Sequence, residues 1–243
     1  AGIQADIKTA DAHGIFSTTA ITALTAQNTL GVTGVVDTPP EFVAAQINAV
    51  LSDIGANAIK IGMLSNSAII EAVAKSIKNA ECPLVLDTVM LAKGGAKLLQ
   101  DEAIKALKTL LIPMAAIVTP NIPEAEALAD ISIKTTADMI AAGRKILALG
   151  AKAVLVKGGH MDGDKVTDLL ITPENQLLFT NDRIKTKNTH GTGCALASAI
   201  ACHLTKGDKL ENAVENAINY VQKAIKTAPD IGKGHGPLNH FVN

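Results

Sequence analysis

Aromatic residues are scarce in this sequence of 243 residues: they make up 2% of it, with no tryptophan and a single tyrosine. Basic charge is not in excess either, because the formal net charge is −1 and no run of lysine and arginine stands out. Nucleic-acid binding relies on a basic surface and on aromatic stacking platforms. These absences argue against a nucleic-acid partner, and we expect a small-molecule partner instead.

Cysteines are few as well, and the three present, Cys82, Cys194 and Cys202, form no CxxC pair. A sparse, odd set in a long chain favours reduced thiols and a cytoplasmic location over a disulfide framework. No stretch reaches the roughly 18 uninterrupted apolar residues of a membrane span, and none resembles a signal peptide. We therefore expect a cytoplasmic protein without a membrane partner.

Short apolar runs alternate with helical patterns, which is typical of parallel βαβ units in an α/β protein. The runs are "AIKIGML" at 58, "PLVLDTVM" at 83, "AAIVTPN" at 115 and "AVLVKGGH" at 153. Helical spacing and terminal glycines mark 39–55 and 135–150 as helices. A Pro-Glu-Asn turn within 166–186 predicts a hairpin at a sheet edge. With no repeat or linker in view, we expect one domain over 1–243 with a doubly wound sheet.

Polar residues follow the predicted strands. In a doubly wound sheet, ligands bind at the carboxyl ends of the strands. Those ends carry Met63, Asp87, Asn121, Glu124 and Lys157. We expect them on one rim, around a ligand.

The stretch "NTHGTGC" leads directly into the apolar pattern "ALASAIACHL". Glycines let backbone N–H groups converge, and a helix N-terminus adds partial positive charge, so Gly191 to Cys194 suit an anion such as phosphate. An ordinary loop and helix start explains the same letters. Thiols at helix N-termini ionise more readily than free thiols, which favours Cys194 as a base or nucleophile, whereas we assign Cys82 and Cys202 to packing.

Asn121 and Glu124 stand three residues apart at a predicted helix start. An amide and a carboxylate on one face suit Mg²⁺ held through water beside phosphates. Glu124 is equally explained as a first-turn carboxylate that favours the helix dipole. The histidines show no ligand spacing such as HExxH, and we propose no zinc site.

Several segments occur together from Ala1 to about Phe241: "GIQADIKT", "ALTAQNTLGV", "KIGML", "LDTVMLAKGG", "TPNIPEAEAL", "KGGH", "NTHGTGC" and "GKGHGPLNHF". As a set they resemble the hydroxymethylpyrimidine and phosphomethylpyrimidine kinases of thiamin biosynthesis, within the ribokinase-like superfamily. The resemblance implies a three-layer sandwich with a mostly parallel central sheet, flanking helices and a short edge hairpin. It also implies a homodimer that uses ATP and Mg²⁺ to phosphorylate 4-amino-5-hydroxymethyl-2-methylpyrimidine and then its monophosphate.

The resemblance also implies roles for individual residues. The pyrimidine is expected at Asp6, Gln27, Met63 and Val89. The anion hole is expected at Gly191, Thr192, Gly193 and Cys194, with Cys194 beside the reacting hydroxymethyl group. ATP is expected at Asp87, Asn121, Glu124, Lys157 and Thr189, with Mg²⁺ held by Glu124 through water. A glutamine amide matches an aminopyrimidine edge bidentately, which independently favours Gln27.

Two alternatives remain. One is a pyridoxal kinase of the same fold, against which the surroundings of Gln27 and the segment "GKGHGPLNHF" favour the pyrimidine. The other is a non-catalytic pyrimidine-binding regulator, against which the retained phosphate residues argue. Members of the family begin with a strand and a glycine-rich turn ahead of "AGIQADIKT", so we expect such residues before Ala1 in the natural protein.

Overall fold

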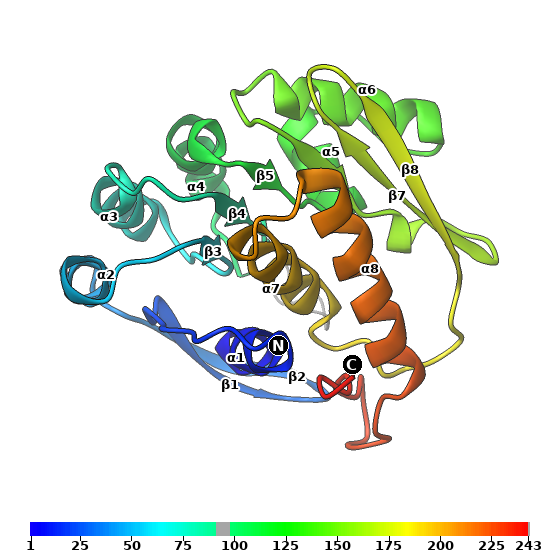
Figure 1. Cartoon of the computed structure of the whole chain (residues 1–243), viewed down its shortest axis with the longest axis horizontal. Coiled ribbons are helices and arrows are strands. Elements are labelled where there is room, and N and C mark those ends of the chain that lie inside the picture. Colours follow the sequence, from blue (N-terminus) through cyan, green and yellow to red (C-terminus); the bar gives the residue numbers. More distant parts are fainter. Residues whose placement is uncertain (91–97, 243) are drawn as a thin grey trace.

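A six-stranded sheet forms the middle layer of the protein in a computed structural model, which describes residues 1–90 and 98–242 (Figure 1). Its strands are β3 (Ile59–Ile61), β4 (Leu84–Leu86), β5 (Ile117–Val118), β6 (Val154–Val156), β7 (Lys165–Ile171) and β8 (Gln176–Asp182). β3 to β6 are parallel, and β7 and β8 form an antiparallel hairpin at the edge, as predicted. The "LAKGG" part of one motif lies outside the described residues.

The strands lie side by side in chain order, so the winding differs from the prediction. A doubly wound sheet contains a reversal of strand order, and none occurs here among the described strands. One face is covered by α2 (Pro40–Asp53), α3 (Ser67–Ile77), α4 (Asp101–Ala106), α5 (Ile122–Ala129) and α6 (Thr136–Leu147); the other is covered by α7 (Thr192–Thr205) and α8 (Leu210–Lys226). α1 (Ile3–Ala12) packs against α7. The three layers are those of the predicted sandwich.

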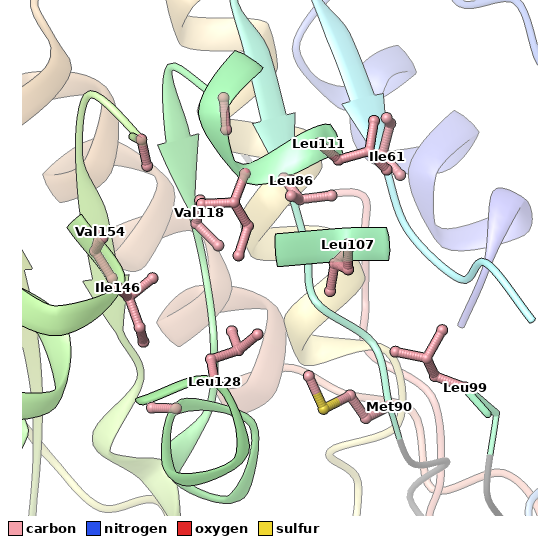
Figure 2. Close-up of a cluster of buried hydrophobic side chains, with 14 of the residues drawn as sticks. Ile61, Leu86, Met90, Leu99, Leu107, Leu111, Val118, Leu128, Ile146 and Val154 are labelled. Carbon is pink, nitrogen blue, oxygen red and sulfur yellow. The ribbon is translucent and has the colours of Figure 1, made fainter. Parts of the chain in front are cut away.

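Each central strand alternates its side chains between two buried cores, because neighbouring residues of a strand point to opposite faces. Leu84 and Leu86 of β4 face the α3 side, whereas Val85 faces α7 and α8. Figure 2 shows part of the first core, where these strand and helix side chains meet: Ile61, Leu86, Val118, Val154, Leu107, Leu111, Leu128 and Ile146. Among the described residues, no helix is long and apolar enough to cross a membrane.

The predicted helices 39–55 and 135–150 are confirmed as α2 and α6. A capping box between Thr135 and Asp138 starts α6. The chain leaves α6 through Gly150, whose φ of 110° is in the left-handed region that favours glycine. Local sequence therefore decides where these helices begin and end.

A separate two-stranded sheet was not predicted. It consists of β1 (Ala23–Asn28) and β2 (Gly31–Asp37), which are antiparallel and have mostly exposed side chains. Figure 1 shows this β1–β2 hairpin beside α1, apart from the central sheet. It carries Gln27, next to a register shift between Ala26 and Gln27.

The C-terminal segment (residues 229–242) returns from α8 to the turn of the β1–β2 hairpin. The backbone N–H of His235 donates to the Thr29 carbonyl at 2.8 Å, and the N–H of Gly234 donates to the Thr29 hydroxyl at 3.2 Å. A Cβ on Gly234 would lie 2.1 Å from the Thr29 carbonyl oxygen, so only glycine fits there. The His190 N–H also donates to the Gly236 carbonyl, which ties the segment to the loop before α7.

Candidate active site

A cavity of about 1400 Å³ opens at the carboxyl ends of β3 to β6. α1, the β1–β2 hairpin and the first turn of α7 complete its walls. Every residue that the sequence analysis assigned to a site lines this cavity: Asp6, Gln27, Met63, Asp87, Val89, Asn121, Glu124, Lys157, Thr189, Gly191, Thr192, Gly193 and Cys194. The expected rim of strand-end residues is therefore present.

The first turn of α7 presents backbone N–H groups to the cavity. Gly191 precedes the helix with φ of 88°, a left-handed conformation that favours glycine, and no side chain caps the helix start. The first N–H groups of an uncapped helix lack partners within the helix and carry partial positive charge. The Thr192 N–H donates to the Thr189 carbonyl at 3.4 Å, and the rest of this helix start is suited to an anion.

A buried ion pair lies against this turn. Lys157 Nζ is 2.9 Å from Asp87 Oδ1, which also accepts a hydrogen bond from the Thr119 hydroxyl at 3.2 Å. A Cβ on Gly193 would lie 3.3 Å from Lys157 Nζ and 3.6 Å from Asp87 Oδ2, so the glycine lets α7 approach the pair closely. The site therefore joins a helix N-terminus to a fixed ammonium group.

Opposite charges keep this pair ionised. Burial alone would raise the pKa of Asp87, but Lys157 and Lys60 outweigh it and hold the pKa below its ordinary value. Burial would likewise lower the pKa of Lys157, but Asp87 and Glu124 outweigh it and raise the pKa. Lys157 is thus a permanent cation, the form that binds phosphate.

Glu124 is buried at the start of α5 and forms a capping box with Asn121. Glu124 Oε2 accepts the Asn121 N–H at 2.9 Å and the Thr88 hydroxyl at 3.1 Å, while Asn121 Oδ1 accepts the Glu124 N–H at 3.0 Å. Burial raises the pKa of Glu124, with Lys157 opposing the shift and Asp87 adding to it. The helix-start interpretation is confirmed, and Oε1 takes no part in the capping box.

Asp6 lines the cavity but is already engaged by protein groups. Both of its carboxylate oxygens accept hydrogen bonds from Lys60 Nζ, at 2.9 and 3.0 Å, and Oδ1 also accepts the Ser198 hydroxyl at 2.7 Å. Gln27 has an exposed side chain at the cavity wall. Of these two predicted pyrimidine contacts, Gln27 makes fewer hydrogen bonds within the protein and is the more available to a ligand.

Three charged residues of the cavity were not predicted from the sequence: Lys60, Asp168 and Arg183. Lys60 lies within β3, and Asp168 lies on β7, where its Oδ1 accepts the Gly158 N–H at 2.8 Å. For Lys60 the available signal was a charged residue inside the otherwise apolar run "AIKIGML". Such a side chain needs a partner, and the partner of Lys60 is distant in sequence.

Two of the three cysteines line the cavity: Cys194, which is half-buried, and Cys202, which is buried. Cys82 is half-buried and lies outside the cavity. Burial raises the pKa of the Cys202 thiol to about 11. Burial and the raised pKa agree with the packing role expected for Cys202.

Comparisons with known proteins agree on one family. Residues 1–239 match the family model described as phosphomethylpyrimidine kinase. The chain is 46% identical over 244 residues to the hydroxymethylpyrimidine/phosphomethylpyrimidine kinase of Bacillus subtilis, covering 100% of this chain and 90% of that protein.

Two kinases are among the solved structures that resemble the chain. A phosphomethylpyrimidine kinase from Clostridium difficile is 42% identical, with a TM-score of 0.83 and coverage of 93% of each chain. An ADP complex of Bacillus subtilis pyridoxal kinase is 35% identical, with a TM-score of 0.91 and coverage of 99% of this chain and 92% of that one.

Proposed function

The chain belongs to the phosphomethylpyrimidine kinase family, and from this premise we propose that it catalyses two successive transfers. ATP phosphorylates 4-amino-5-hydroxymethyl-2-methylpyrimidine, and a second ATP phosphorylates the resulting monophosphate to the diphosphate. The observation that carries the proposal is the meeting of the α7 N-terminus with the Lys157–Asp87 pair in one cavity. Reduced thiols support a cytoplasmic location for this enzyme of thiamin biosynthesis.

In the first transfer the hydroxymethyl oxygen attacks the γ-phosphorus of ATP, and the bond to the β–γ bridging oxygen breaks. The N–H groups of Gly191 to Cys194 stabilise the transferred phosphoryl group, and Lys157 neutralises charge on ATP. Cys194 accepts the proton of the alcohol. ADP leaves, and the pyrimidine monophosphate remains.

The nucleotide side of the cavity is formed by residues that surround Lys157. ATP would lie along these residues: Asp87, Asn121, Glu124, Lys157 and Thr189. The ammonium group of Lys157 is fixed there by Asp87. Positioning of this kind accounts for most of the catalysis in phosphoryl transfer.

Magnesium fits beside Glu124. Oε2 of this carboxylate is used by the capping box and Thr88, which leaves Oε1 available for a water-mediated contact. Within the described residues, no three His, Cys, Asp or Glu side chains are placed to hold a metal ion by themselves. The phosphates and water would therefore complete the coordination, and the bound ion would neutralise phosphate charge.

The pyrimidine would lie on the other side, among Asp6, Gln27, Met63 and Val89. The amide of Gln27 pairs with the amino group and a ring nitrogen, as such an amide does with adenine. Met63 and Val89 supply apolar contact to the ring. This side is closed by the β1–β2 hairpin, which carries Gln27.

A coupled ATP-consumption assay tests the function with four acceptors in parallel: the hydroxymethylpyrimidine, its monophosphate, pyridoxal and ribose. Turnover of both pyrimidines, and its loss in Lys157→Met, are expected. Turnover confined to pyridoxal or ribose would overturn the proposal. Tight binding of the pyrimidine without ATP consumption would instead support a regulator.

Pyridoxal is the second candidate substrate because pyridoxal kinases are among the structural relatives. We propose it as a side activity only, since the higher sequence identities belong to the pyrimidine kinases. The four-acceptor assay measures it directly.

A homodimer is proposed on the exposed β1–β2 hairpin. Leu24 and Val36 face each other across its strands and are 63% and 67% exposed. Exposed apolar side chains on a small sheet favour a contact with a second copy.

A further inference from the structure

Lys60 is a buried cation on the acceptor side of the cavity. Its side chain is 11% exposed, and two of the three N–H donors of its ammonium group reach the two oxygens of Asp6. Ser198, one helical turn after Cys194 on α7, donates to the same carboxylate. Lys60 and α7 therefore meet at Asp6, one helical turn after Cys194.

The backbone makes room for this ammonium group. A Cβ on Gly62 would lie 2.9 Å from Lys60 Nζ, so the missing side chain leaves space beside the cation. Gly62 precedes Met63, which is on the proposed pyrimidine side. The two lysines of the cavity have different carboxylate partners: Asp87 holds Lys157, and Asp6 holds Lys60.

Lys60 stays charged. Burial would lower its pKa, but negative charge at Cys194, Asp6 and Asp87 outweighs burial and raises the pKa well above its ordinary value. A buried ammonium that is always protonated can bind an anion at any physiological pH.

The two proposed acceptors differ mainly in charge. The hydroxymethyl group is neutral, whereas a phosphate monoester is largely dianionic at pH 7. During the second transfer the N–H groups of α7 and Lys157 are occupied by the incoming phosphoryl group and ATP. The phosphate already on the pyrimidine then needs a cation of its own.

We propose that Lys60 binds the phosphate of the monophosphate acceptor and so allows one site to accept an alcohol and a phosphate in turn. This inference rests on the proposed function. Among the residues that the structure describes, Lys60 Nζ donates to Asp6 alone, so its third N–H donor is available to the acceptor phosphate. Because Ser198 also holds Asp6, the carboxylate keeps a partner when the ammonium is shared.

A structural role for Lys60 would look different. If the ammonium only held Asp6 and α1 in place, its loss would impair both transfers equally, because both use the same pyrimidine pocket. Selective loss with the phosphorylated acceptor is the distinguishing result.

The test compares Lys60→Met with Lys60→Arg, using each acceptor separately with saturating ATP. We expect Lys60→Met to lower kcat/KM for the monophosphate about 10- to 100-fold more than for the alcohol, mainly through KM, because a charge-assisted hydrogen bond is lost. Lys60→Arg should recover most of the loss. Calorimetric titration of the monophosphate without ATP should show the same weakening.

Ser198→Ala is the matched control, since it removes a hydrogen bond to Asp6 but keeps the ammonium group. Equal changes with both acceptors are expected for it. If Lys60→Met does not fold, Gly62→Ala serves, because its Cβ displaces the ammonium without removing the charge; the same selective loss, smaller in size, is expected.

Equal losses with both acceptors in Lys60→Met or Gly62→Ala would overturn the role of Lys60 and leave the proposed function standing. A wild-type protein that phosphorylates neither pyrimidine would overturn both.

Discussion

Cys194 is the residue on which the two proposed transfers differ most in their need for a base. The alcohol must lose a proton, whereas the phosphate acceptor is already anionic at pH 7. We expect Cys194→Ala to slow phosphorylation of the alcohol about 100-fold or more and to affect the monophosphate by less than about tenfold. Single-turnover measurements with each acceptor check this.

Cys194→Ser provides the control, because the serine hydroxyl is a polar group at the same place but is a poor base. It should behave like Cys194→Ala with the alcohol. Equal slowing of both transfers would show that Cys194 only shapes the pocket.

Asp168 links pH to stability. Burial raises its pKa to about 6, with the Gly158 N–H and Lys157 opposing the shift. The folded state then binds the proton more tightly than the unfolded chain, so this group stabilises the fold below about pH 4. That stability is lost as the pH rises through about 6.

Asp168→Asn keeps an oxygen acceptor for Gly158 and removes the titration. We expect its free energy of unfolding to exceed that of the wild type by roughly 1 to 2 kcal/mol at pH 7.5, with no gain at pH 4. Urea denaturation at both pH values measures the difference. A gain of the same size at both would contradict the assignment.

For individual residues, the sequence indicated those whose surroundings are formed by their neighbours in the chain. Gly191 to Cys194 stand out because glycines and a helix start are adjacent in the chain. Lys60 was missed because Asp6, its partner, is 54 residues away. Nothing in the strand pattern shows which distant group neutralises a buried charge.

Among the elements, the connection from β6 to β7 depends on one glycine. A Cβ on Gly158 would lie 1.9 Å from the Thr167 carbonyl oxygen, whereas one on Gly159 meets nothing within 4 Å. Gly158→Ala should therefore lower the free energy of unfolding by about 1 to 3 kcal/mol, and Gly159→Ala should be close to neutral. Thermal denaturation of the two variants compares them directly, and equal effects would contradict the steric argument.

The predicted elements were those with buried faces or clear caps. The start of α2 is marked by prolines and that of α6 by a capping box, and a glycine follows each helix. The β1–β2 hairpin was missed because its strands have few buried side chains, so the expected alternation of polar and apolar residues is absent.

For the whole molecule, the proposed dimer gives a prediction about assembly. Val36→Asp places a charge on the exposed face of the β1–β2 hairpin, so the wild type should be a dimer and the variant a monomer by light scattering. Leu178→Asp, at a residue of β8 that is 55% exposed, is the matched control and should leave the dimer intact. A monomeric wild type would contradict the proposal.

The sequence predicted the layers of the molecule but not its winding. Alternating strands and helices require helices on the faces of the sheet, whatever the strand order. The order itself depends on which strands pair. Short apolar strands such as β4 and β5 have similar sequence patterns, so the pattern does not determine which strand lies next to which. The expected double winding was therefore wrong, whereas the cavity lies at the carboxyl ends of the strands, where the sequence predicted a site.

The contact between Thr29 and the C-terminal segment has a consequence for biosynthesis. The ribosome releases the turn of the β1–β2 hairpin early, whereas Gly234 and His235 follow only after α8. For most of translation the nascent chain therefore carries Gln27 on a hairpin whose partner has not been made. The turn of the hairpin therefore gains its C-terminal partner only near the end of synthesis, and the wall of the cavity that the hairpin forms is completed last.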